Sequence, residues 1–218
     1  MIQYLKNKED CMYFDRKCKI TFIAHGATIY TDENRFSDVE NYPPLSEAGV
    51  EEIEKICQFL KVRRIKNDKI IASPALRTVQ SAKMISKIYK QDFEILEELK
   101  TRKYGSLNGM TFSQLEEEHH DMLDKLINHP EIPVPEDSES VTDFILRTSS
   151  LIEKIVDENL GNRVIIVTYP DVIKAAICAT LKIPHSSLPH IYIKTGSATQ
   201  ISYYEGWESL VYSDYTPL

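Results

Sequence analysis

The stretch Lys19–Thr28, which reads KITFIAHGAT, decides the fold class of this chain. Its first six residues form a short apolar run that is typical of a buried strand. The run leads directly into His25 and Gly26. Ligands of α/β proteins bind outside the carboxyl ends of the strands. A lone histidine is more often a structural residue than a catalyst, but packing explains this position poorly, so His25 is our first candidate.

Two further strands end in the same way. KIIAS (residues 69–73) leads into a helix that carries Arg77 in its first turn, and RVIIVT (residues 163–168) breaks at Tyr169-Pro170-Asp171. A helix amino terminus favours anions. Arg77 therefore suggests a bound anion between itself and the helix, the alternative being a surface arginine paired with a carboxylate.

Strands alternate with helices for most of the length. Apolar spacing predicts helices that begin at Ser46 and Pro74, helices over Phe112–Ile127 and Val141–Asn159, and one that ends at Leu181. In the tail, HIYIKT, ATQISYY and SLVYS alternate apolar and polar residues as antiparallel strands do. We predict a three-layer αβα sandwich with a mostly parallel central sheet and an antiparallel edge. The loops 27–45, 99–111 and 128–140 are the expected rim of a site.

The composition narrows the function classes. The chain has 218 residues and a net charge of −7, which argues against nucleic-acid binding and against a basic membrane-binding surface. No apolar run approaches the ~20 residues of a spanning helix, and the first residues do not resemble a signal peptide. We expect a polar extension over residues 1–18 and one domain over residues 19–218.

The cysteine and histidine spacings suggest no metal site. Cys57 and Cys178 lie in apolar helical patterns, so we expect buried thiols and a cytosolic location. The pair His119-His120, which follows Glu116–Glu118, is expected on a solvated helix face.

Eight segments, taken together and in order, resemble the histidine phosphatase superfamily in its phosphoglycerate-mutase-like branch. They cover about residues 19–218 and read FIAHGAT, NRFS, YPPLSEAG, ASPALRTVQSA, RKYGSLNG, SES…R, VIIVTYPDVIKAA and SDYTPL. The resemblance implies the phosphoglycerate-mutase-like fold. It also implies phosphoryl transfer through a phosphohistidine, without a metal or other cofactor.

The resemblance assigns roles to residues that match the family pattern. His25 matches the nucleophile, and Arg77 matches an arginine that clamps the phosphoryl group. Arg35 matches an arginine of the loop after the first strand. Arg102 and Tyr104 match the arginine and tyrosine that follow the catalytic acid and face the substrate.

Three core positions depart from that pattern. Ala24 stands where the family has an arginine, Thr101 where it has the acidic glutamate, and Tyr169 where it has a second histidine. Tyr169 could donate one hydrogen bond to a phosphate but carries no positive charge. Asp171 is the candidate for a substitute acid.

These departures predict a degraded catalytic site. Loss of the acid alone costs ~10²–10⁴ in rate. Our leading hypothesis is a protein that binds a small phosphorylated or otherwise anionic ligand, or a partner protein, with little turnover. One alternative is a slow or specialised phosphomonoesterase that acts through His25. The other is a structural interaction protein with a vestigial cleft, and the tyrosine-rich tail strands offer an edge for a homodimer.

Overall fold

The structure, a computed structural model, describes residues 16–38 and 42–217. The predicted extension therefore lies mostly outside the described residues. Its last three residues belong to strand β1 (Arg16–Ala24), so the sheet begins before the boundary that we predicted at residue 19.

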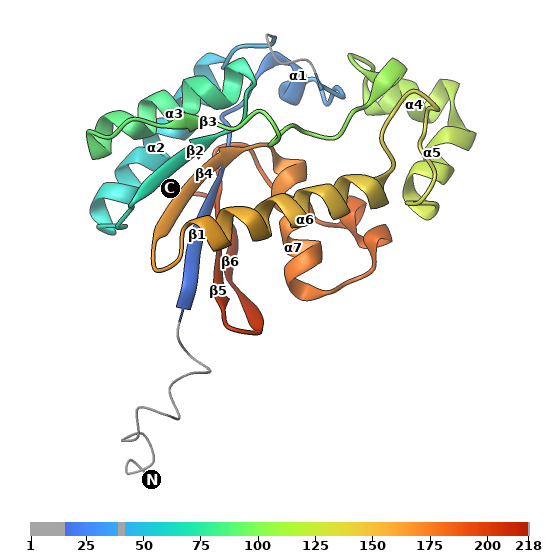
Figure 1. The fold of residues 1–218 in the computed structure, drawn as a ribbon. Coiled ribbons are helices and arrows are strands. Elements are labelled where there is room, and N and C mark those ends of the chain that lie inside the picture. Colours follow the sequence, from blue (N-terminus) through green and yellow to red (C-terminus); the bar gives the residue numbers. More distant parts are fainter. Residues whose placement is uncertain (1–15, 39–41, 218) are drawn as a thin grey trace.

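A single six-stranded sheet forms the centre of the molecule (Figure 1). Its strand order is β3 (Glu94–Ile95), β2 (Lys69–Ala72), β4 (Arg163–Thr168), β1, β5 (Ala198–Tyr204) and β6 (Trp207–Tyr215). The first four strands are parallel, whereas β5 and β6 are antiparallel to their neighbours. The predicted mostly parallel sheet with an antiparallel edge is confirmed.

Helices cover both faces of the sheet (Figure 1). Helices α2 (Glu47–Val62) and α3 (Leu76–Tyr89) pack on one face, and α6 (Val141–Glu158) and α7 (Pro170–Leu181) pack on the other. These three layers match the predicted αβα sandwich.

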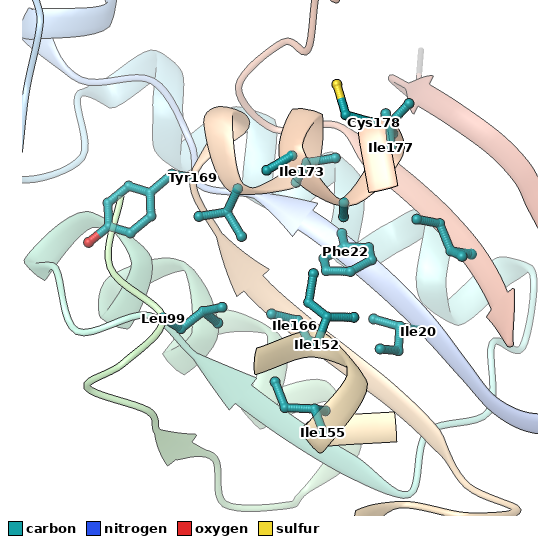
Figure 2. Close-up of a cluster of buried hydrophobic side chains, with 14 of the residues drawn as sticks. Ile20, Phe22, Leu99, Ile152, Ile155, Ile166, Tyr169, Ile173, Ile177 and Cys178 are labelled. Atoms are coloured by element: carbon teal, nitrogen blue, oxygen red, sulfur yellow. The ribbon is translucent and has the colours of Figure 1, made fainter. Parts of the chain in front are cut away.

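The strands alternate between two cores because successive side chains of a strand point to opposite faces. Ile20 and Phe22 of β1 join the cluster under α6 and α7, whereas Ile23 joins the cluster under α2 and α3. Figure 2 shows the first cluster, with Tyr169 at its margin and the Tyr169 hydroxyl directed away from Phe22. The core therefore ends where the carboxyl edge of the sheet begins.

The remaining elements are short and lie between the long ones. They are α1 (Ile29–Asp32), the 3₁₀ turns η2 (Gly105–Leu107) and η3 (His185–His190), α4 (Phe112–Glu118) and α5 (His120–Asn128). The predicted helix over Phe112–Ile127 is thus wrong, because His119 adopts a non-helical conformation between two helices. Leu115 of α4 and Leu123 and Leu126 of α5 belong to one small apolar cluster.

The tail also differs from its prediction. HIYIKT is not a strand, whereas the two later segments form β5 and β6. Ala198 pairs with Ile23, and Ser197 and Gly196 still hydrogen-bond to the backbone of Ala24 and His25. HIYIKT, which ends at Thr195, therefore lies beyond the end of β1.

Candidate active site

The residues that follow three of the strands lie at one edge of the sheet. β1, β4 and β2 are parallel neighbours, so their carboxyl ends coincide. The His25 amide donates to the Thr168 carbonyl at 2.9 Å, and the Ser73 amide donates to the Val167 carbonyl at 3.0 Å. The strand ends are therefore hydrogen-bonded to one another immediately before the chain turns into the site.

Gly26 fixes the turn that follows His25. A Cβ atom at Gly26 would lie 2.1 Å from the Gly49 carbonyl oxygen of α2, a contact that no side chain tolerates. The glycine therefore lets the loop lie directly against the first turn of α2, and this close approach sets the position of His25.

His25 is neutral and buried, with 3% of its surface exposed. Its Nδ1 lies 2.8 Å from the Gly26 carbonyl oxygen, which only accepts, so Nδ1 is the donor and Nε2 keeps its lone pair. Burial and the nearby Arg77 charge lower the pKa of His25 to about 3, although the Gly26 bond opposes them. This is the tautomer in which Nε2 can attack an electrophile.

Arg77 lies in the first turn of α3 and is 2% exposed. Its guanidinium donates to the Ser37 carbonyl at 3.2 Å. Burial lowers the pKa of Arg77, and Tyr169, Tyr104 and Asp38 oppose that shift. Arginine stays protonated in proteins, so a positive charge lies within the edge of the sheet.

Tyr169 contacts both candidate residues. Its ring meets the His25 ring edge to face at a centroid distance of 6.0 Å, and the Arg77 guanidinium carbon lies 4.9 Å from its centroid. Tyr169 and Ala24 also belong to the apolar cluster under α6 and α7. Two of the three departures from the family pattern therefore extend the hydrophobic core to this edge.

Most of the predicted site residues surround one pocket of about 160 Å³, which we call the His25 pocket. Its lining includes His25, Arg35, Arg77, Thr101, Tyr104, Tyr169 and Asp171. Ala24 and Arg102, which we also singled out, do not line it. The residues that the sequence singled out therefore come together from five separate segments.

Tyr104 and Asp171 are bound to each other within the pocket wall. The Tyr104 hydroxyl donates to Oδ2 of Asp171, and the Lys174 ammonium lies 3.0 Å from Oδ1. Burial alone would raise the pKa of Asp171, but Lys174, the Tyr104 hydroxyl and Arg102 together lower it. Asp171 is therefore a carboxylate, which is the wrong protonation state for a general acid.

Arg102 lies against Tyr104 rather than in the pocket. Its guanidinium carbon is 4.8 Å from the centroid of the Tyr104 ring, and its Nε is buried with no hydrogen-bond partner. Burial and Asp171 raise the pKa of Tyr104. Arg102 thus packs on the Tyr104 ring, and its charge helps to lower the pKa of Asp171.

Thr101 is held in place through its backbone. Arg147 of α6 donates to the Thr101 carbonyl at 2.9 Å and to the Lys100 carbonyl at 3.2 Å. The same guanidinium is bound by both carboxylate oxygens of Glu139. The position that the family resemblance assigns to the acid is therefore rigid but carries a hydroxyl.

Arg35 lies at the mouth of the His25 pocket with its charge already paired. Its Nε donates to Glu33, and its Nη1 donates to the Gly109 carbonyl at 2.7 Å. About a third of the side chain is exposed. Arg35 is therefore a weaker anion ligand than Arg77.

Sequence reasoning missed several contributors to the site. Lys174, three residues after Asp171 on α7, could have been found from helical spacing. Ser37, whose buried hydroxyl has no hydrogen-bond partner among the described residues, and the Glu139–Arg147 pair left no signal beyond their place in the quoted segments. Glu116–Glu118 are exposed, as expected.

Residues 16–38 and 42–217 contain no group of three or more His, Cys, Asp or Glu that could hold a metal ion. None of the helices described in these ranges is long and apolar enough to span a bilayer.

Residues 20–214 match the sequence pattern of the histidine phosphatase superfamily, branch 1. The chain is 30% identical over 157 residues to "Putative phosphoserine phosphatase 2" of Hydrogenobacter thermophilus, covering 71% of this chain and 74% of that protein. It is 23% identical over 164 residues to "Phosphoglycerate mutase-like protein 4" of Arabidopsis thaliana, covering 72% and 68%.

The fold is similar to a solved structure of a phosphoserine phosphatase from Entamoeba histolytica in complex with 3-phosphoglyceric acid. The TM-score is 0.81 at 20% sequence identity, over 91% of this chain and 98% of that one.

Proposed function

Because the chain belongs to branch 1 of the histidine phosphatase superfamily, we propose that it binds phosphorylated ligands in the His25 pocket and turns them over very slowly. His25 and Arg77 are the residues that we assign to the phosphoryl group. Thr101 and Tyr169 stand at the positions where the family resemblance places an acid and a second histidine.

One observation carries this proposal: the two halves of the site are in different chemical states. His25 is neutral with Nε2 unprotonated, and Arg77 brings a buried positive charge to the same pocket. The carboxyl group that lines the pocket, Asp171, is ionised and held by Tyr104 and Lys174. The pocket can therefore attract a phosphoryl group, but this carboxyl brings no proton for the leaving oxygen.

The expected rate follows from the missing groups. An acid contributes ~10²–10⁴ and each donor to the developing charge roughly 10²–10³. Removing one acid and two donors from a typical turnover of about 10 s⁻¹ leaves on the order of 10⁻⁵ s⁻¹. A protein with this turnover acts by binding its ligand rather than by converting it to product.

The alternative is a specialised phosphomonoesterase, and the tautomer of His25 favours it. A histidine that is neutral and aimed through Nε2 is suited to nucleophilic attack. Esters with good leaving groups need little help from an acid, so they are the substrates on which this activity would be seen.

Calorimetry with inorganic phosphate tests the proposed function. Two charge-assisted contacts predict a Kd of about 1 mM at pH 7. Arg77→Ala should remove measurable binding, whereas Arg64→Ala in the exposed turn after α2 should leave it unchanged. Absence of binding to the unaltered protein would contradict the proposal.

A parallel hydrolysis assay separates the proposal from its alternative. Turnover near 1 s⁻¹ that is abolished by His25→Ala would establish the specialised phosphomonoesterase. Turnover below about 10⁻³ s⁻¹, together with phosphate binding, supports the degraded site.

A structural interaction role would use the free edge of β6. Val211 and Tyr215 are exposed on this strand, and an unpaired edge can add a strand from a second copy. We place this homodimer below ligand binding because it gives no role to the pocket in which the neutral His25 meets the Arg77 cation. Sedimentation velocity tests the proposed homodimer.

The buried free thiols of Cys18, Cys57 and Cys178 support the cytosol as the proposed compartment.

A further inference from the structure

A second cavity adjoins the His25 pocket at Thr101. It has a volume of about 970 Å³ and is lined by the segment after β3, the loop before α6 and the first two turns of α6. In Figure 1 the green chain after β3 passes over α6 on its way to α4. Thr101 lines both this outer cavity and the His25 pocket, so a ligand of one meets the other at this residue.

Thr101 presents an unused hydrogen-bonding group at that junction. The residue is 8% exposed, and its hydroxyl takes part in none of the hydrogen bonds formed within residues 16–38 and 42–217. The hydroxyl oxygen itself is not enclosed by protein, so it faces the cavities. A hydroxyl without a partner in the described residues, placed between two cavities, is available to bond an atom of a ligand.

The rim of the outer cavity is preorganised. Arg147 is bound to the Lys100 and Thr101 carbonyls and to Glu139, and Glu139 in turn accepts from the Lys103 amide at 3.3 Å. The Glu139 amide donates to the Lys103 carbonyl at 2.9 Å. Both walls are thereby fixed before any ligand arrives, which lowers the entropy lost on binding.

The outer cavity carries an excess of negative charge. Its lining holds five carboxylates and three cations, which are Asp38, Glu97, Glu98, Glu139 and Asp143 against Lys100, Lys103 and Arg147. Arg147 pairs with Glu139, and Lys100 lies 3.9 Å from Glu97.

Three carboxylates then remain against Lys103, and one of them, Asp38, also interacts with the Arg77 charge of the His25 pocket. Asp38 and Asp143 accept hydrogen bonds from the Tyr104 amide and the Ser140 hydroxyl, both neutral donors that leave the negative charge in place. Glu98 is exposed at the rim. The complement of this lining is a positively charged group.

We propose that the ligand is a phosphate ester of an amine-bearing alcohol, bound across both cavities. Its phosphoryl group occupies the His25 pocket, its ester oxygen accepts from the Thr101 hydroxyl, and its ammonium group lies among Asp38, Glu98 and Asp143. This inference rests on the proposed function, since it requires a phosphoryl group beside His25.

Calorimetry at pH 7 with four probes tests the ligand class. Phosphoethanolamine carries the ammonium group, ethyl phosphate lacks it, phosphoglycolate replaces it with a carboxylate, and inorganic phosphate lacks the alcohol. We expect phosphoethanolamine to bind about tenfold more tightly than ethyl phosphate, and phosphoglycolate to bind least tightly of the three esters.

Two variants locate the effect. The double variant Glu98→Gln/Asp143→Asn should remove the preference for phosphoethanolamine while inorganic phosphate binds as before. Its matched control is Glu51→Gln/Glu54→Gln, which makes the same charge change at exposed positions of α2 on the other face of the sheet. Thr101→Val should weaken all three esters several-fold but not inorganic phosphate.

Each outcome discriminates. Equal affinities for phosphoethanolamine and ethyl phosphate, with inorganic phosphate still bound, would overturn this inference and leave the proposed function intact. A preference that survives in the double variant would also overturn it. Failure of inorganic phosphate to bind would overturn the proposed function and the inference together.

Discussion

Two walls of the His25 pocket use buried polar groups in opposite ways. The histidine wall consists of His25 and Arg77, and the tyrosine wall consists of Tyr104, Asp171 and Lys174. Nε2 of His25 accepts no hydrogen bond from the described residues. In the tyrosine wall, by contrast, the Tyr104 hydroxyl donates to Oδ2 of Asp171, and Lys174 pairs with Oδ1.

The difference teaches how a site can keep the groups that bind a ligand while it loses the groups that catalyse the reaction. A buried charge must be compensated either by a ligand or by the protein. The tyrosine wall is compensated internally and therefore stabilises the fold. The histidine wall offers a phosphoryl group the Nε2 lone pair of His25 and the positive charge of Arg77.

The largest effect should come from rebuilding the positions that depart from the family pattern. The triple variant Ala24→Arg/Thr101→Glu/Tyr169→His should raise phosphate release from ethyl phosphate by at least about 10²-fold, because it restores an acid and two donors. Single changes should do little, since residues that act as a unit are not additive.

Adding His25→Ala to the triple variant provides the control and should return the rate to background. An unchanged rate in a folded triple variant would mean that the two walls no longer have the geometry of an active site.

The second effect concerns the histidine wall and is a dependence of stability on pH. The folded pKa of His25 is about 3 and its ordinary value is 6.5, so the unfolded state binds a proton between these values while the folded state does not. The free energy of unfolding should therefore fall as pH falls from about 6.5, by at most about 1.4 kcal/mol per pH unit.

Urea unfolding between pH 4 and 7 measures this slope, with His25→Asn as the comparison because asparagine does not titrate. Equal slopes in the two proteins would show that His25 is not neutral in the folded state.

The third effect isolates the tyrosine wall. Tyr104→Phe should lower the free energy of unfolding at pH 7 by about 1.5–3 kcal/mol, because it removes a donor from the largely enclosed Asp171 carboxylate, whose side chain is 18% exposed. Tyr192→Phe is the matched control at a residue that is 74% exposed and should have little effect. A loss below 0.5 kcal/mol, roughly that of a surface substitution, would mean that this wall does not stabilise the fold.

The smallest effect separates two arginines that line the same pocket. Arg35→Ala should weaken binding of inorganic phosphate less than about threefold, because Arg35 is partly exposed and already paired with Glu33. Calorimetry compares it with Arg77→Ala, for which we expect the loss of measurable binding. Similar losses in both variants would show that Arg35 contacts the anion directly.

The sequence predicted those features that depend on local pattern. KITFIA and RVIIVT are buried strands, and the rule that ligands bind at strand ends brought His25, Arg77 and Tyr169 to one pocket. HIYIKT shows the limit of that approach. Its alternation is typical of a strand, but a strand needs a neighbour, and β1 has ended by then.

The sequence did not reveal which residues of the site bind one another. Asp171 looked like a substitute acid because of its place after a strand. Its protonation state depends first on Lys174, which helical spacing could have indicated, but also on Tyr104, 67 residues away in the chain, and on Arg102. Such distances are set by tertiary packing, which no local pattern encodes.

Arg147 binds the Lys100 and Thr101 carbonyls and the Glu139 carboxylate, an arrangement that we call the Arg147 clamp. The clamp affects how this part of the molecule moves. It joins the segment before η2 to the loop before α6 through side-chain and backbone hydrogen bonds that share few members with the sheet. The amide protons of Lys103 and Glu139 should therefore exchange with solvent as one cooperative unit, which opens while the central strands stay closed. The two cavities would then widen and narrow together, and whatever binds in one would slow the opening of both.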